Sequence, residues 1–224
     1  MKHSGFLITL EGPEGGGKST LAPEVEKYFS SLGLDVLALA EPGGTRIGER
    51  IRAIIMDNEL TEITPKAEAL LFQAARAQIV GEKVAPHLLR GGIVLLDRYR
   101  DSSEAYQGGA RGLGSAIPKL NRWTTGNLVP DLTLLLDLPA EDGLRRKTKA
   151  GEINRLDAEA LKFHQRVREE YLIMAARNEG GRWVVVDASK PIDEVLREAK
   201  GIITEELFAR GFIERPSSRI EASG

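Results

Sequence analysis

One short segment near the start of the chain constrains the fold more than any other. Residues 12–19 read Gly-Pro-Glu-Gly-Gly-Gly-Lys-Ser and fit the pattern G-x-x-x-x-G-K-[ST]. The apolar run Phe6–Leu10 before this segment predicts a buried strand, and the residues after it predict a helix. A strand, a glycine-rich turn and a helix N-terminus in this order are typical of a loop that binds the phosphates of ATP or GTP.

The residue types in this loop each have a chemical role. Glycine lets consecutive backbone N–H groups turn inward around an oxyanion, which a side chain would obstruct. We expect Lys18 to reach the β- and γ-phosphates and the hydroxyl group of Ser19 to coordinate Mg²⁺. The predicted nucleotide-binding residues are Gly12, Pro13, Glu14, Gly15, Gly16, Gly17, Lys18, Ser19 and Thr20.

The rest of the sequence predicts an α/β fold. Further apolar runs that predict buried strands are Val36–Leu39, Ile93–Leu96, Leu132–Leu136 and Trp183–Val186. Segments with the apolar spacing of helices lie between them, at Ile47–Met56, Ala67–Val80 and Leu161–Ala176. Strands that alternate with helices form mostly parallel sheets covered on both faces. The sequence therefore predicts a P-loop NTPase fold with a five-stranded, mostly parallel sheet flanked by helices.

Length and composition narrow the class of protein. The chain has 224 residues without a segment resembling an interdomain linker, so we expect one domain over residues 1–213 and a disordered tail over residues 214–224. Its 31 basic and 33 acidic residues nearly cancel, whereas proteins that bind nucleic-acid polymers are usually basic. The sequence contains no cysteine, and we find no signal peptide and no apolar stretch long enough to span a membrane. These features predict a cytoplasmic protein whose partners are neither nucleic-acid polymers nor membranes.

Two aspartates end apolar runs and are candidates for a second Mg²⁺ ligand. Asp97 is followed by Arg98, which places a carboxylate and a guanidinium at one strand end, where ligands of open α/β sheets bind. Asp137 is followed by a leucine and a proline, which indicates a structural role. We therefore predict that Asp97 completes the metal site with Ser19. A surface ion pair between Asp97 and Arg98 is the alternative, but adjacent strand residues point to opposite faces.

Features outside the loop distinguish the classes of P-loop protein. The segment after Leu136 lacks the N-K-x-D motif with which GTPases read guanine, and Pro13 stands where partitioning ATPases carry an extra lysine. A basic segment late in the chain consists of Arg145-Arg146-Lys147-Thr148-Lys149, followed by Arg155. We interpret it as a mobile lid over about residues 143–156 that excludes water and stabilises the charge of phosphoryl transfer. The alternative interpretation is a solvated helix face.

Several motifs, in order and at matching spacing, resemble those of bacterial thymidylate kinases. They are Leu10-Glu11-Gly12 with the phosphate loop, Glu41-Pro42-Gly43-Gly44-Thr45, Leu70-Leu71-Phe72 with Arg76, Asp97-Arg98-Tyr99, and Ala105-Tyr106-Gln107-Gly108. The resemblance runs from about Phe6 to about Ala199. It implies a nucleoside monophosphate kinase-like fold and an enzyme that uses ATP and Mg²⁺ to phosphorylate thymidine monophosphate (dTMP) in deoxynucleotide synthesis. It also implies a homodimer.

The resemblance assigns residues that recognise the acceptor nucleoside. In the family, the residue at the position of Phe72 stacks on thymine and the residue at the position of Arg76 hydrogen-bonds a base carbonyl. These two residues are four apart and share one face of a helix. The position of Ser103 approaches the base edge, that of Tyr106 crowds the 2′ position of the sugar, and Gln107 lies beside it.

The resemblance also assigns residues that handle phosphate. Arg98 and Arg52 are expected to hold the acceptor phosphate, because a planar guanidinium suits a phosphate dianion. Glu14 matches an acidic position that contacts the sugar 3′-hydroxyl group or the reaction centre. The loop has no arginine after Glu14, so the lid should supply the catalytic arginine, for which Arg146 is the candidate. The predicted catalytic residues are Lys18, Asp97, Arg98, Arg146 and Glu14.

Departures from the family pattern leave two questions open. Thr148 and Ala150 stand where the family usually has arginine, and Asn154 stands where it has aspartate, so the identity of the catalytic lid residue is not fixed. Another nucleoside monophosphate, such as uridylate, cytidylate or guanylate, is an alternative acceptor. A regulatory ATP-binding protein is an alternative of a different class, and it predicts nucleotide binding without acceptor-stimulated turnover.

Overall fold

The computed structural model describes residues 3–151 and 153–214, and residues 215–224 of the predicted tail lie outside this part. Its centre is a sheet of five parallel strands in the order β2-β3-β1-β4-β5. The strands are β1 (Phe6–Glu11), β2 (Val36–Ala40), β3 (Ile93–Asp97), β4 (Leu132–Asp137) and β5 (Trp183–Asp187). All five predicted strands are present, and the predicted α/β class is confirmed.

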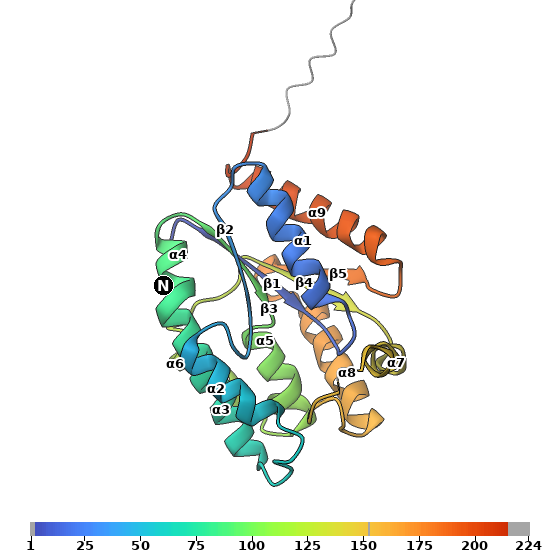
Figure 1. The fold of residues 1–224 in the computed structure, drawn as a ribbon. Helices are drawn as coiled ribbons and strands as arrows, with labels where there is room; N and C mark the ends of the chain where they lie inside the picture. The colour runs from blue at the N-terminus through green and yellow to red at the C-terminus, as the bar shows by residue number, and fades with distance from the viewer. Residues whose placement is uncertain (1–2, 152, 215–224) are drawn as a thin grey trace, which may run out of the picture.

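Helices connect the strands and cover both faces of the sheet (Figure 1). The α-helices are α1 (Lys18–Ser31), α2 (Arg46–Met56), α3 (Pro65–Ile79), α4 (Ala85–Leu89), α5 (Arg100–Ser103), α6 (Ala116–Thr124), α7 (Ala140–Ala150), α8 (Leu161–Arg177) and α9 (Ile192–Ala209). The described residues also form two π-helical segments and a 3₁₀ turn, which are η1 (Val80–Val84), η2 (Glu104–Ala110) and η3 (Glu179–Gly181). Within the described residues, no helix combines the length and the apolar character needed to cross a membrane.

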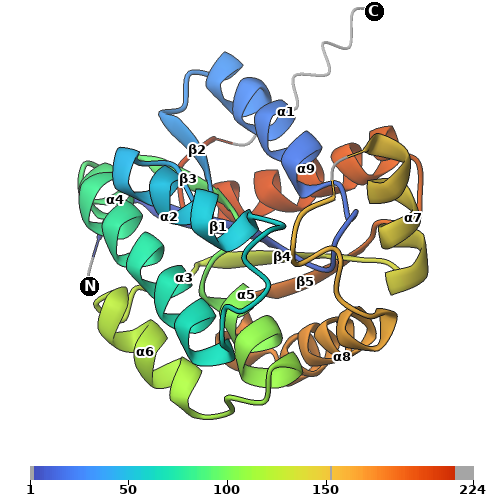
Figure 2. The same ribbon diagram turned by 60° about the horizontal axis from the view of Figure 1, so that its bottom comes forward.

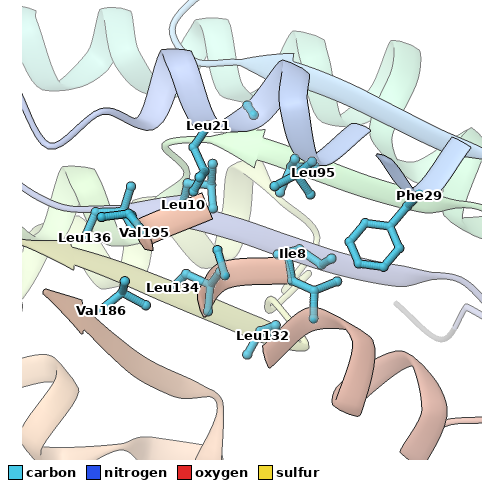
Figure 3. Close-up of a cluster of buried hydrophobic side chains, with 14 of the residues drawn as sticks. Ile8, Leu10, Leu21, Phe29, Leu95, Leu132, Leu134, Leu136, Val186 and Val195 are labelled. Atoms are coloured by element: carbon cyan, nitrogen blue, oxygen red, sulfur yellow. The ribbon is translucent and has the colours of Figure 1, made fainter. Parts of the chain in front are cut away.

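The core is divided between the two faces of the sheet. On one face, Ile8 and Leu10 of β1 pack with Leu21 of α1 and Val195 of α9 (Figure 3). On the other face, Leu7 packs against the run formed by α3, η1 and α4, while η2 and α8 cover β4 and β5. Successive side chains of β1 therefore enter opposite layers, as expected for a parallel sheet buried on both sides. Each buried leucine contributes about 1.5–3 kcal/mol to the free energy of unfolding.

Two glycines fix α7 against the turn between β1 and α1. A Cβ atom added to Gly143 of α7 would lie 2.1 Å from the backbone oxygen of Glu14, and one added to Gly15 would lie 2.2 Å from that of Gly143. Gly15 also has a φ of 69°, which disfavours other residues. Both glycines are therefore required for this close backbone contact.

Replacing Gly143 by alanine should destabilise the fold and displace α7 from the turn. We expect the free energy of unfolding to fall by about 1–3 kcal/mol, because two backbone segments must separate to admit the methyl group. Gly201→Ala in α9 is the matched control, since its added Cβ meets no atom within 4 Å. It should stabilise the protein by about 0.5–1 kcal/mol. Denaturant unfolding curves of the two variants measure this, and equal stability of Gly143→Ala and the unmodified protein would contradict the contact.

Candidate active site

The carboxyl ends of the strands open into a cavity of about 1150 Å³. The turn after β1, the end of β3, α3, η2 and α7 all contribute to its lining. Predicted site residues that line it are Glu14, Gly15, Gly16, Gly17, Lys18, Ser19, Thr20, Arg52, Phe72, Arg76, Asp97, Arg98, Ser103, Tyr106, Gln107 and Arg146. Gly12 and Pro13 are not among the lining residues, and their carbonyl groups accept hydrogen bonds from Lys18. The fold thus brings together residues that lie more than 100 positions apart.

The phosphate loop ends in an uncapped helix N-terminus. Gly17 is the N-cap of α1, with a φ of 85°, and no side chain accepts a hydrogen bond from the first turn. The first N–H groups and the positive end of the helix dipole therefore remain available to an anion. The Nζ atom of Lys18 lies 3.0 Å from the Gly12 oxygen and 2.8 Å from the Pro13 oxygen. Burial and the neighbouring charge of Arg98 lower the pKa of Lys18 to about 8.

A carboxylate of the loop binds the arginine that follows β3. Arg98 donates a hydrogen bond to Glu14 Oε1 at 2.7 Å, and the Tyr106 hydroxyl group donates to the same oxygen at 2.8 Å. Arg98 also donates to the Gly12 oxygen at 3.0 Å, and its guanidinium lies over the ring of Tyr106. Burial alone would raise the pKa of Glu14, but Arg98 and Lys18 lower it to about 2. The site therefore holds an ionised carboxylate between two cations.

Glu11, which was not predicted as a site residue, holds the turn that contains Arg98. Arg98 has a φ of 71°, a strained value for a residue with a side chain. Its neighbour Tyr99 donates its backbone N–H group to Glu11 Oε1 at 2.9 Å, and Ser102 donates its hydroxyl group to Glu11 Oε2 at 2.6 Å. Burial, together with repulsion from Asp101, raises the pKa of Glu11 to about 7. The sequence did carry a signal for this residue, because Glu11 is an acidic residue directly after the apolar run Phe6–Leu10.

The two candidate aspartates occupy different environments. Asp97 lines the cavity together with Ser19, and burial raises its pKa while Lys18 and Arg98 oppose that effect. Asp137 instead accepts two hydrogen bonds from Arg168, at 2.8 and 2.9 Å. Carboxylate and hydroxyl oxygens are the hard ligands that Mg²⁺ prefers. Over the described part of the chain, no group of three or more His, Cys, Asp or Glu side chains is placed to hold a metal ion.

Arg76 is held rigidly on the opposite side of the cavity. Its Nε atom donates to Glu41 Oε2 at 2.7 Å, and Nη1 donates to Ser103 Oγ at 2.7 Å and to Asn121 Oδ1 at 3.0 Å. Nη2 donates to the Tyr99 backbone oxygen at 2.9 Å, and the side chain is only 1% exposed. These bonds use four of the five N–H groups of the guanidinium. Phe72, one turn earlier on α3, also lines the cavity.

The loop after β2 places Arg52 at the mouth of the cavity. Thr45 caps α2 by accepting the Gly48 N–H group at 2.9 Å, and Glu49 accepts the Gly44 N–H group at 2.7 Å. The first bond caps the helix and the second holds the residue before the N-cap, so together they fix the start of α2. Arg52 lies two turns along α2 and donates to the Pro42 oxygen at 2.8 Å.

Another buried carboxylate, Glu68 of α3, accepts hydrogen bonds from three side chains and was missed by sequence reasoning. Arg111 donates two hydrogen bonds to it, and Arg155 and Gln107 donate one each. Arg155 also donates to the Ile55 backbone oxygen at 2.9 Å. Arg155 was predicted as part of the mobile basic segment, but its side chain is buried in these contacts and does not line the cavity.

Comparisons with known proteins agree with one another over most of the chain. Residues 10–199 match the family model described as thymidylate kinase. A thymidylate kinase from Geobacillus thermodenitrificans is 44% identical over 207 residues, which cover 91% of this chain and 92% of that protein. The thymidylate kinase of Geobacillus sp. strain WCH70 is 45% identical over 92% of this chain and 99% of its own length. That of Bacillus cytotoxicus is 46% identical, with 91% and 99% covered.

Proposed function

Since this chain belongs to the thymidylate kinase family, we propose that the cavity at the carboxyl ends of its strands is where ATP phosphorylates dTMP to thymidine diphosphate. The observation that carries this proposal is the convergence of two distant elements on one cavity. The phosphate loop lines one side of it, and Phe72 and Arg76 of α3 line the other. A donor phosphate and an acceptor base can therefore be bound within the same cavity.

ATP would lie on the phosphate loop, with its phosphates against the uncapped N-terminus of α1. Lys18 would contact the β- and γ-phosphates, exchanging its bonds to the Gly12 and Pro13 oxygens for charged partners. Ser19 and Asp97 have the oxygen donors to hold Mg²⁺. When bound, this ion neutralises phosphate charge and orients the donor.

The acceptor nucleoside would lie between Phe72 and η2. Phe72 offers a ring face for thymine, and the remaining Nη2 N–H group of Arg76 can donate to a base carbonyl oxygen. Ser103, already bound to Arg76, would contact the base edge. Tyr106 and Gln107 would lie at the sugar, with the Tyr106 ring crowding the 2′ position.

The acceptor phosphate would lie between Arg98, Arg52 and the donor. One of its oxygens attacks the γ-phosphorus in line, and the bond from that phosphorus to the bridging oxygen breaks, leaving its electron pair on ADP. The attacking oxygen is already ionised, so no strong general base is needed. The rate acceleration comes from positioning and charge neutralisation. Glu14 orients Arg98 through their 2.7 Å hydrogen bond.

Phe72→Ala tests the acceptor assignment. Base–aromatic stacking contributes about 1–3 kcal/mol by alanine substitution, so we expect KM for dTMP to rise about 5- to 150-fold. KM for ATP should stay within about threefold, because the phosphate loop is unaffected. Lys66→Ala, on an exposed position of the same helix, is the control. Steady-state kinetics with each substrate varied in turn provide the measurement, and an equal rise of both KM values would contradict the assignment.

We also propose that two copies associate through α3 and α6, which pack side by side (Figure 2). Trp123 of α6 is 81% exposed and Leu70 of α3 is 57% exposed, and large exposed apolar side chains favour a protein partner. Sedimentation velocity should give the mass of a dimer, and a monomer at micromolar concentration would contradict this.

Three expectations from the sequence stay predictions. They are a single domain, a mobile lid over residues 143–156 that closes on it, and a cytoplasmic location.

A further inference from the structure

We propose that Lys147, rather than Arg146, is the lid residue that contacts the transferred phosphoryl group. This inference rests on the proposed function, because it assigns a residue to phosphoryl transfer in the same cavity. Both residues lie on α7, which packs against the phosphate loop through Gly143.

The contact at Gly143 determines which side chains of α7 reach the cavity. Gly143 approaches Glu14 and Gly15 so closely that no side chain fits between them. Residues three and four positions further along a helix lie on the same face, one turn away. These residues are Arg146 and Lys147, and both line the cavity.

Arg146 is directed toward the donor side of the loop. Its Nη1 atom donates to the backbone oxygens of Ala188 at 2.9 Å and Gly15 at 3.3 Å, and Nη2 donates to the Ser189 oxygen at 3.4 Å. Ala188 and Ser189 follow β5 and line the end of the cavity with α9. Arg146 therefore joins α7 to the phosphate loop and to the β5–α9 connection, and these three carbonyl groups hold its guanidinium there.

Lys147 lies beside Asp157 and acts on Glu14, on the side of the cavity where we place the meeting of donor and acceptor. Its Nζ atom lies 3.7 Å from Asp157 Oδ2, and its side chain is 21% exposed, compared with 66% for Arg145. Its charge, after those of Arg98 and Lys18, helps to keep Glu14 ionised. Lys147 thus belongs to the group of charges around Glu14, the residue that binds Arg98.

The other cations of the segment are placed elsewhere. Arg145 pairs with Asp142 at 2.8 Å, and neither it nor the exposed Lys149 lines the cavity. Arg155 is buried against Glu68 and the Ile55 oxygen. Among the described residues, this leaves Arg146 and Lys147 as the cations of the segment that line the cavity.

Lys147 would act as a point charge at the transferred group. Without nucleotide, its ammonium is balanced by the carboxylates of Asp157 and Glu14. The γ-phosphate brings a stronger anion, to which the ammonium can donate hydrogen bonds while charge builds on the equatorial oxygens. No proton leaves Lys147 in this step. The electron pair of the broken bond stays on ADP, whose oxygen leaves as an anion and needs no proton from the lysine.

The test compares Lys147→Met with Arg146→Met and with Lys149→Met as the control. Lys147→Met should lower kcat about 10²–10³-fold, as expected for the loss of one transition-state donor, with KM for dTMP within about threefold. Lys147→Arg should recover most of kcat, because the charge is kept. Arg146→Met should raise KM for ATP more than it lowers kcat, and Lys149→Met should match the unmodified enzyme. The melting temperature of each variant, compared with that of the unmodified enzyme, shows that it is folded.

Three results would overturn the inference in different ways. If Arg146→Met loses about 10²–10³-fold in kcat while Lys147→Met stays within threefold, Arg146 is the lid cation instead. If the unmodified protein turns over no dTMP, the proposed function fails and this assignment fails with it. Turnover by the unmodified protein together with an unchanged Lys147→Met variant overturns the assignment alone.

Discussion

Lys18→Ala should lower kcat by at least about 10²–10³-fold, because it removes a preorganised cation from the transferred phosphate. The Nζ atom is held in the loop by the Gly12 and Pro13 carbonyl groups, and it would exchange these bonds for phosphate oxygens when ATP binds. Burial and Arg98 lower its pKa to about 8, which means that the surrounding protein groups stabilise the ammonium poorly. Bound ATP phosphates would supply the negative charge that the ammonium lacks. Lys18 should therefore act chiefly when ATP is bound, and its removal should lower kcat.

Steady-state kinetics at saturating dTMP measure this effect. Lys27→Ala, on the exposed side of the same helix, is the control and should keep the rate of the unmodified enzyme. The melting temperature of Lys18→Ala should not fall in parallel with its rate, because a desolvated charge is lost rather than a packed apolar group. A kcat within about tenfold of the unmodified value would contradict the role of Lys18.

Arg98→Ala should lower kcat/KM for dTMP by at least about 10²–10³-fold. The guanidinium bonds Glu14 Oε1 and the Gly12 oxygen, so it lies between the loop and the proposed acceptor phosphate. Without it, Glu14 loses the cation that lowers its pKa most, and its repulsion of the acceptor phosphate is no longer offset. KM for ATP should change less, because Lys18 and the N-terminus of α1 remain in place.

Two further variants define the role of Arg98. Arg98→Lys keeps the charge but loses the planar fork, and it should recover only part of the lost kcat/KM. Arg122→Ala, at an exposed position of α6, should behave as the unmodified enzyme. A loss confined to KM for ATP in Arg98→Ala would place Arg98 on the donor instead of the acceptor.

Periodicity predicted the elements of the fold but not their polar ends. The apolar run Phe6–Leu10 predicts β1, yet the strand continues to Glu11, whose carboxylate is satisfied by Tyr99 and Ser102. The helix expected over Ala67–Val80 is α3 (Pro65–Ile79), and it passes directly into the π-helical segment η1. Apolar spacing marks the buried side of an element, whereas its ends depend on hydrogen bonds to residues distant in sequence.

The candidate site was predictable where a motif fixes local geometry. The phosphate loop is of this kind, because its strand, glycines and helix are contiguous. The network at Glu68 is not, since Arg111 and Arg155 lie 43 and 87 positions away from it. Arg155 was grouped with the lid cations because it follows them in sequence, and only the fold reveals that it is buried. The positions of Arg146 and Lys147 likewise follow from the contact at Gly143, which leaves no periodic signal.

The most direct test of the central claim is a coupled assay of ADP release with Mg·ATP and a panel of acceptors. The panel contains dTMP and the monophosphates of uridine, deoxyuridine, cytidine and guanosine. Our account predicts the highest kcat/KM for dTMP. Preferred turnover of another acceptor would contradict the base and sugar assignments of Phe72, Arg76 and Tyr106. ATP binding without turnover of any acceptor would contradict the account as a whole.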